Sequence, residues 1–189
     1  MPNWSQVSYR IRGKKKHLRN LNSILNKLGK RKTPLVKNGF GKYWLGCLVT
    51  ALGGDWNEIP CRGEINYYYL DTDYLEINFE VAWSERREFR DFIESHYNNE
   101  IKIFYSQEEP GMGIYETNSY EEFNTRYIID GEEEPFPEYY SDIEEVSRVL
   151  SDYIGEDIEP NIESIEDAIS DFEIDTTKWL SFHEFSLVD

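Results

Sequence analysis

The sequence predicts an α+β protein: a ferredoxin-like antiparallel sheet with helices on one face, extended by further strands and helices at the C-terminal end. Two observations support this fold class. A hairpin with one apolar face lies in the middle of the first 110 residues, and stretches with apolar residues at helical spacing flank it. The resulting order is strand, helix (doubled), strand, strand, helix, strand, which is the split βαβ arrangement.

The first strand is predicted over residues 4–12, where Val7, Tyr9 and Ile11 alternate with polar residues. Four leucines at spacings of three, four and three then predict an amphipathic helix that ends at Gly29, namely Leu18, Leu21, Leu25 and Leu28. A basic linker over residues 30–40 separates it from a second helix, predicted over residues 42–52.

The hairpin is predicted from strands over residues 64–70 and 74–83, joined by a turn at Asp71-Thr72-Asp73. Its inward face alternates strictly through Ile65, Tyr67, Tyr69, Leu75, Ile77, Phe79, Val81 and Trp83. Ser84 is expected to cap the next helix, whose stripe is Phe89, Phe92, Ile93, His96 and Tyr97. Asn98-Asn99 ends that helix, and a strand follows over residues 101–107.

Beyond this point, short strands are predicted over residues 113–117 and 126–129. A helix follows, opened by a capping box at Ser141–Glu144, and then another helix and an aromatic-rich extended segment over residues 179–188. We expect residues 1–130 to form the ferredoxin-like core with an edge-strand extension. Residues 131–189 are expected to form an acidic helical extension packed on that core as a single cooperative unit, because residues 141–188 are few for an independent core.

Charge is segregated along the chain. Residues 1–54 contain 12 Lys and Arg and no Asp or Glu, residues 55–105 carry a net charge of −7, and residues 106–189 carry −22. Such asymmetry is typical of nucleic-acid binding at one end or of acidic mimicry at the other. The alternative, which we favour, is that the ends neutralise each other or are simply solvated, so that the intact protein binds no nucleic acid.

RNA binding through the open sheet face is disfavoured for a specific reason. RNA-recognition modules of this topology carry stacking aromatics on their first and third strands. Here the corresponding faces carry Ser8, Arg10 and Arg12, and Glu76, Asn78 and Glu80. Arg10 and Arg12 are expected to form cross-strand ion pairs with Glu76 and Glu80.

Three short motifs carry a resemblance: Pro2-Asn3-Trp4 before the first strand, Ala82-Trp83-Ser84 after the third, and the turn Glu108-Glu109-Pro110-Gly111. With a CRGEI loop before the hairpin and an RYIID strand after the core, the chain resembles the YubB-type ferredoxin-like family over residues 2–130. These are small proteins often carried by plasmids and phages. The resemblance implies the fold that the periodicity predicts, and it brings no established activity, catalytic residues or cofactor.

The sequence contains no nucleophile elbow, zinc-protease, Walker A or dinucleotide motif. Cys47, Cys61 and three scattered histidines are too few and too dispersed for a zinc site, so we expect no metal and no cofactor. The candidate binding residues are Trp56, Arg62 and Glu64, around the loop before the hairpin. The alternative, which we favour, is that the tryptophan folds under the loop and the arginine satisfies carbonyls or acidic neighbours.

These observations favour a non-enzymatic binding or regulatory protein that acts through protein–protein contacts. The alternatives are an acidic nucleic-acid mimic that occupies a DNA-binding protein, and an enzyme with a carboxylate-lined pocket. The first residues lack the apolar stretch of a secretory signal, and no apolar run approaches the roughly 20 residues of a spanning helix. We therefore expect a cytoplasmic protein with no membrane partner.

Overall fold

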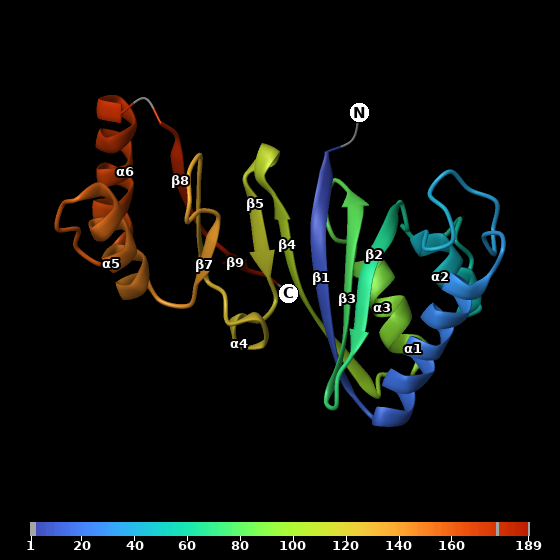
Figure 1. The fold of residues 1–189 in the computed structure, drawn as a ribbon. Helices are drawn as coiled ribbons and strands as arrows, with labels where there is room; N and C mark the ends of the chain where they lie inside the picture. The colour runs from blue at the N-terminus through green and yellow to red at the C-terminus, as the bar shows by residue number, and fades with distance from the viewer. Residues whose placement is uncertain (1–2, 177, 189) are drawn as a thin grey trace. The chain divides into compact units, whose positions relative to one another are not determined.

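The computed structural model describes residues 3–176 and 178–188, and it has an α+β fold (Figure 1). Pro2, the first residue of the sequence resemblance, lies outside these residues. The chain divides into two compact units, Met1–Ile114 and Tyr115–Asp189, which we call the N-terminal unit and the C-terminal unit.

In the N-terminal unit, four antiparallel strands lie in the order β2-β3-β1-β4, because β1 pairs with both β3 and β4, and β2 pairs with β3. The strands are β1 (Trp4–Gly13), β2 (Gly63–Leu70), β3 (Tyr74–Ala82) and β4 (Ile101–Glu109). The helices are α1 (Lys15–Lys30), α2 (Leu45–Ala51) and α3 (Arg87–His96), followed after β4 by a 3₁₀ turn, η1 (Pro110–Met112). The predicted elements of this unit are confirmed, with small shifts of their ends.

The three helices lie on one side of this sheet (Figure 1). The inward strand residues are buried, including Val7, Tyr9 and Ile11 on β1, and Leu75, Ile77, Phe79 and Val81 on β3. All four leucines of the predicted stripe on α1 are buried as well. The hydrophobic effect therefore holds the helices against one face of the sheet.

The opposite face of the sheet is polar. Arg10 is paired with Glu76, with 3.4 Å between guanidinium and carboxylate, as expected. The expected pairing of Arg12 with Glu80 is wrong, because the antiparallel register places Arg12 opposite Tyr74 and Glu80 opposite Gln6. The Arg12 guanidinium lies 5.6 Å from the Tyr74 ring centre.

The hairpin differs from its predicted alternation on β2. Its register shifts between Ile65 and Tyr67, so Tyr68 and not Tyr67 lies opposite Ile77. Tyr67 and Tyr69 are consequently exposed, at 53% and 49%. The inserted residue of a bulge reverses the faces of every residue after it.

The predicted Ser84 cap is also wrong. The cap residue of α3 is Arg86, which makes no side-chain capping bond. The side chain of Glu85 is instead drawn into the core, where the Tyr9 hydroxyl donates to it at 2.5 Å, so the helix begins two residues later than predicted. At the other end, His96 is exposed and does not belong to the buried stripe, whereas Tyr97 is buried.

The C-terminal unit has a three-stranded sheet in the order β7-β6-β8, and a short parallel pair of β5 with β9. Its strands are β5 (Ile114–Thr117), β6 (Tyr127–Gly131), β7 (Glu138–Tyr140), β8 (Leu180–Glu184) and β9 (Ser186–Leu187). Its helices are α4 (Tyr120–Phe123), α5 (Ile143–Ile154) and α6 (Ile162–Thr176). The cap of α5 is Asp142, one residue later than the predicted Ser141, and its carboxylate accepts from the Glu145 N–H at 2.8 Å.

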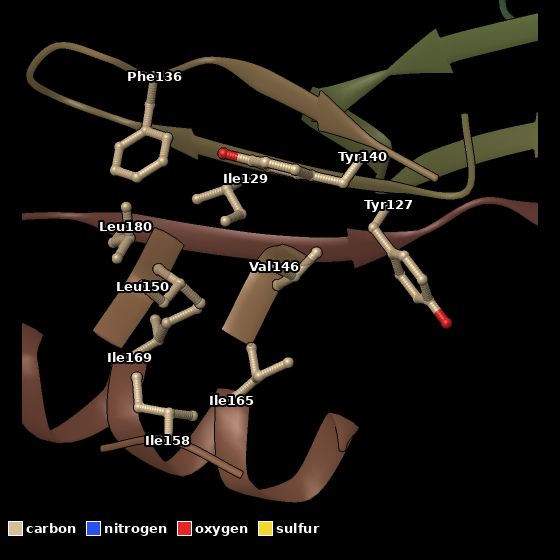
Figure 2. Close-up of a cluster of buried hydrophobic side chains, with 10 residues drawn as sticks. All are labelled: Tyr127, Ile129, Phe136, Tyr140, Val146, Leu150, Ile158, Ile165, Ile169 and Leu180. Atoms are coloured by element: carbon tan, nitrogen blue, oxygen red, sulfur yellow. The ribbon is translucent and has the colours of Figure 1, made fainter. Parts of the chain in front are cut away.

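Helices α5 and α6 bury their apolar stripes against strands of their own unit (Figure 2). The cluster consists of Tyr127, Ile129, Phe136, Tyr140, Val146, Leu150, Ile158, Ile165, Ile169 and Leu180. Residues 115–130, which the sequence analysis assigned to the core as an edge extension, belong to this unit because β6 is its central strand. Whether the whole chain unfolds as one cooperative unit stays a prediction.

Candidate protein-binding surface

Trp44 is held against the edge of the sheet at the end of the basic linker. The Ile65 N–H donates to the Tyr43 carbonyl at 2.9 Å, and Trp44 forms an isolated bridge with Glu64. The indole lies over the first turn of α2, where a side chain at Gly46 would collide with the ring. The ring is 8% exposed, so it forms a fixed base for the residues around it.

Phe40 is positioned by a polar turn within the same linker. The side-chain oxygen of Asn38 accepts from the N–H groups of Phe40 and Gly41, both at 2.7 Å. The Asn38 amide also donates to the Val36 carbonyl at 2.7 Å. Asparagine commonly folds a turn back on itself in this way, and here the turn directs Phe40 towards Trp44.

Four aromatic rings from separate segments form a continuous row. The Trp4 and Phe40 ring centres are 6.0 Å apart, and Phe40 lies nearly parallel to Trp44 at 6.5 Å. Trp44 meets Trp56 edge to face at 5.2 Å. The Trp56 segment is a tight turn in which the Asn57 N–H donates to the Asp55 carboxylate at 2.8 Å.

Three rings of this row, all except Trp4, form part of the wall of a surface pocket with a volume of about 410 Å³, which we call the tryptophan pocket. Phe40, Trp44, Trp56 and Arg62 line it, together with the segment Asn57–Cys61. Its volume falls within the range typical of ligand sites, and most of its lining residues are apolar, as such sites usually are.

A second pocket of about 240 Å³ shares Pro60, Cys61 and Arg62 with the first, so the two pockets adjoin at this segment. Trp83 and Arg86 line the second pocket. We call the two pockets and their lining residues the tryptophan–arginine surface. Trp56 is 38% exposed and Trp83 is 45% exposed, so each presents a large apolar side chain to solvent.

The orientation of Trp83 and Arg86 depends on the buried residue between them. The side chain of Glu85 is 4% exposed, and it lies 3.3 Å from Arg90, which is 6% exposed. The Glu85 N–H donates to the Gln107 side chain at 2.6 Å. With Glu85 anchored inward, Trp83 takes a positive φ of 77°, and both it and Arg86 are exposed. Burial raises the pKa of Glu85, although its hydrogen bond from Tyr9 and the charge of Arg90 oppose this shift.

Arg62 and Arg86 are exposed, and neither forms an ion pair with any residue that the structure describes. Glu58 also lines the tryptophan pocket, so the pocket is not purely cationic. Two exposed guanidinium groups beside exposed indoles can nevertheless bind carboxylates at the edge of an apolar contact.

The structure therefore brings together two of the three predicted binding residues. Trp56 and Arg62 line the same pocket, whereas the Glu64 carboxylate lies near Gly41, outside the lining. Nothing in the sequence pattern had indicated Phe40, Trp44 and Arg86 as members of this surface, and Trp83 was predicted to lie in the core, whereas it is exposed. The asparagine–glycine turn before Phe40 was the one local signal that could have pointed to it.

The Cys61 thiol, which lines the tryptophan pocket, is not suited to nucleophilic chemistry. Cys47 and Cys61 are both free and buried. Burial raises the pKa of Cys61 to about 11, with a smaller contribution from Cys47, so the thiolate is scarce at neutral pH. Among residues 3–176 and 178–188, no group of three or more His, Cys, Asp or Glu side chains could hold a metal ion. In the same residues, no helix is long and apolar enough to cross a membrane.

Comparison with known proteins adds no assignment to this geometry. No protein-family model matches the chain, and neither a curated protein nor a solved structure is significantly similar to it.

Proposed function

We propose that this chain is a non-enzymatic binding protein that engages another protein through the tryptophan–arginine surface. The observation that carries the proposal is the pair of pockets that adjoin at Pro60–Arg62, with exposed Trp56 and Trp83 and two arginines free of ion pairs in the described chain. Tryptophan and arginine are the residues most enriched among those that dominate binding energy at interfaces.

The chemistry of the surface also indicates what the partner segment contains. The aromatic wall suits an apolar side chain, and Arg62 and Arg86 suit carboxylates flanking it. Burial of one large aromatic anchor contributes on the order of 2 kcal/mol or more to binding. The partner is therefore proposed to present an apolar residue next to acidic residues.

The scaffold in this proposal is ferredoxin-like. The order of elements and the strand order β2-β3-β1-β4, with helices on one face, support that assignment. Membership of the YubB-type family, suggested by the short motifs in the sequence, is part of the same proposal. A cytoplasmic location is supported by the two free cysteines, since oxidising compartments favour disulfides.

Quantitative affinity capture from cells that express the protein tests this function. The full-length chain and three variants, Trp56→Ala, Arg62→Glu and Trp179→Ala, serve as baits. Trp179 is 48% exposed and belongs to the C-terminal unit, so it is the matched control for loss of a surface tryptophan. We expect proteins that the wild type and Trp179→Ala retain and the other two variants lose. An identical set of proteins on all four baits contradicts the proposal. Reproducible turnover of a substrate by the purified protein contradicts it in favour of the enzyme alternative.

One observation favours acidic mimicry as a second candidate function. On α6, Glu163, Asp167 and Asp171 are exposed at intervals of four residues, with Glu166 beside them. Four residues of helix rise about 6 Å, roughly two phosphate steps along one DNA strand. Among the described residues, none of these carboxylates is in an ion pair.

The same capture experiment distinguishes this candidate. If the carboxylates of α6 mimic DNA, double-stranded DNA should elute the captured partners from the wild-type bait. A variant with Glu166→Lys and Asp167→Lys should lose these partners, whereas Trp56→Ala should retain them. Partners that resist elution by DNA contradict mimicry.

A further inference from the structure

Strand β2 forms an edge of the N-terminal sheet, because β3 is its only strand partner in the described chain. The Asp71 N–H donates to the Tyr74 carbonyl at 2.9 Å, which makes these two residues a hydrogen-bonded pair. Hydrogen-bonded pairs alternate along an antiparallel ladder, so the backbone groups of Tyr68 and Leu70 point away from β3. Among the described residues, only the start of this outer edge is covered, by the bond from Ile65 to Tyr43 and the bridge of Glu64 with Trp44.

A pocket of about 380 Å³ adjoins the uncovered end of this edge. Tyr69 and Leu70 line it on the strand side, and Lys15, Leu18 and Arg19 line it from α1. If a further strand pairs with β2 at Tyr68–Leu70, this pocket can therefore accommodate one of its side chains. On the polar face of the sheet, the exposed rings of Tyr67 and Tyr69 provide cross-strand contacts for the same strand.

The charge on the α1 side of this pocket is positive, because Lys15 and Arg19 line it there. Arg19 is exposed and has no ion-pair partner among the described residues, and Lys15 lies 3.5 Å from the Asp73 carboxylate. Asp71 also lines the pocket, and the bonds that its carboxylate accepts from the Thr72 N–H at 2.6 Å and the Thr72 hydroxyl at 3.1 Å lower its pKa, so it adds one negative charge on the strand side. A second copy paired edge to edge would bring two basic α1 helices together, which opposes self-association.

We propose that the free edge of β2 receives an extended acidic peptide as an added strand. Backbone hydrogen bonds to Tyr68 and Leu70 supply the pairing, and a carboxylate of the peptide binds Arg19 at the mouth of the pocket. This surface is distinct from the tryptophan–arginine surface, and the proposal does not rest on the function assigned above.

The test uses a synthetic capped peptide of about nine residues, alternating glutamate and valine, a length typical of strands. It is titrated into the ¹⁵N-labelled full-length protein and followed by NMR. We expect shifts centred on residues 66–72, and slower amide exchange at Tyr68 and Leu70, whose N–H groups become bonded. The same peptide with alternate backbone nitrogens methylated, or with lysine in place of glutamate, should bind at least about fivefold more weakly.

Two charge reversals on α1 provide matched variants. Arg19→Glu should weaken binding of the glutamate peptide by about fivefold and improve binding of the lysine peptide. Lys27→Glu makes the same change of charge on the same helix, but Lys27 does not line this pocket, so binding should change by less than about twofold. Absence of binding at millimolar peptide, equal binding of the methylated peptide, or equal effects of the two reversals overturns the proposal.

Discussion

The two units of this protein differ most in their charge. The N-terminal unit contains 17 Lys and Arg and 14 Asp and Glu, a net charge of +3, whereas the C-terminal unit contains three and 23, a net charge of −20. Both nevertheless bury a well-defined apolar cluster. The comparison teaches that apolar patterning determines the fold of each unit, whereas charge distinguishes their surfaces.

The units also build their cores differently. In the N-terminal unit, β1 pairs with β4, so Tyr9 lies beside Tyr105, 96 positions away in the chain. In the C-terminal unit, α5 and α6 are neighbours in sequence and contribute four of the ten buried residues in the cluster around Ile129. The exposed aromatic and arginine side chains that we propose for binding belong to the first unit, and the carboxylate row of α6 belongs to the second.

The largest effect is expected for Phe79→Asp in the N-terminal unit. Phe79 is 2% exposed and meets Tyr9 edge to face at 4.8 Å, so the substitution places an unpaired charge in the core. We expect a loss of at least about 4 kcal/mol, enough to unfold the unit. Because one cooperative unit is predicted, amide signals from both units should lose their dispersion. A variant whose C-terminal unit alone keeps dispersed signals would show that the two units fold independently.

Leu150→Ala tests the core of the acidic unit. Leu150 is fully buried within the cluster shown in Figure 2, and its truncation should cost about 2–5 kcal/mol in urea unfolding. Ile174→Ala is the control in the same unit, because Ile174 is 74% exposed, and its effect should stay below about 0.5 kcal/mol. Equal effects of the two substitutions would contradict the assigned core.

Gly46→Ala should disturb the tryptophan pocket with a smaller loss of stability. The added methyl group would collide with the Trp44 ring, which costs about 1–3 kcal/mol and changes the tryptophan emission spectrum. Gly39→Ala, in the nearby linker, meets no atom within 4 Å and should leave both properties unchanged. Unaltered emission in Gly46→Ala would refute the placement of Trp44 against α2.

The smallest effect is expected at Glu100. Hydrogen bonds from Lys14 and His17 hold the pKa of this carboxyl at about 2, below its ordinary value of 4.5. The folded state therefore binds the proton less readily, and Glu100 contributes stability above pH 4.5 that is lost as the pH falls towards 2. Glu100→Gln should be less stable than the wild type at pH 7, and the difference in urea midpoint should shrink between pH 4.5 and 2. A pH-independent difference would show that the substitution acts through packing alone.

The elements with a strict local period could be predicted from the sequence. Two such elements are β3, with the alternation Leu75, Ile77, Phe79 and Val81, and α1, with its leucine stripe. In each, the apolar pattern is complete within the element itself, and the buried face was predicted correctly. The start of α3 was not predicted correctly. Ser84 has the right chemistry for a helix cap, but the Glu85 side chain is bonded to Tyr9, 76 positions earlier in the chain, and the helix begins later. A buried hydrogen bond to a residue distant in sequence can therefore override the local preference of a serine for the helix cap.

The sequence by itself determined the class of the protein, the order of the elements in the N-terminal unit, the inward face of β3 and the segregation of its charge. Only the tertiary structure decided which residues form the tryptophan pocket. Phe40, Trp44, Trp56 and Arg62 share no period, and they meet because the linker bridges to β2 and the loop folds back on Trp44. The limits of the acidic unit were decided in the same way. Ile128 and Ile129 are buried in different clusters on opposite sides of β6, and a strand buried on both sides loses the alternation that reveals its place.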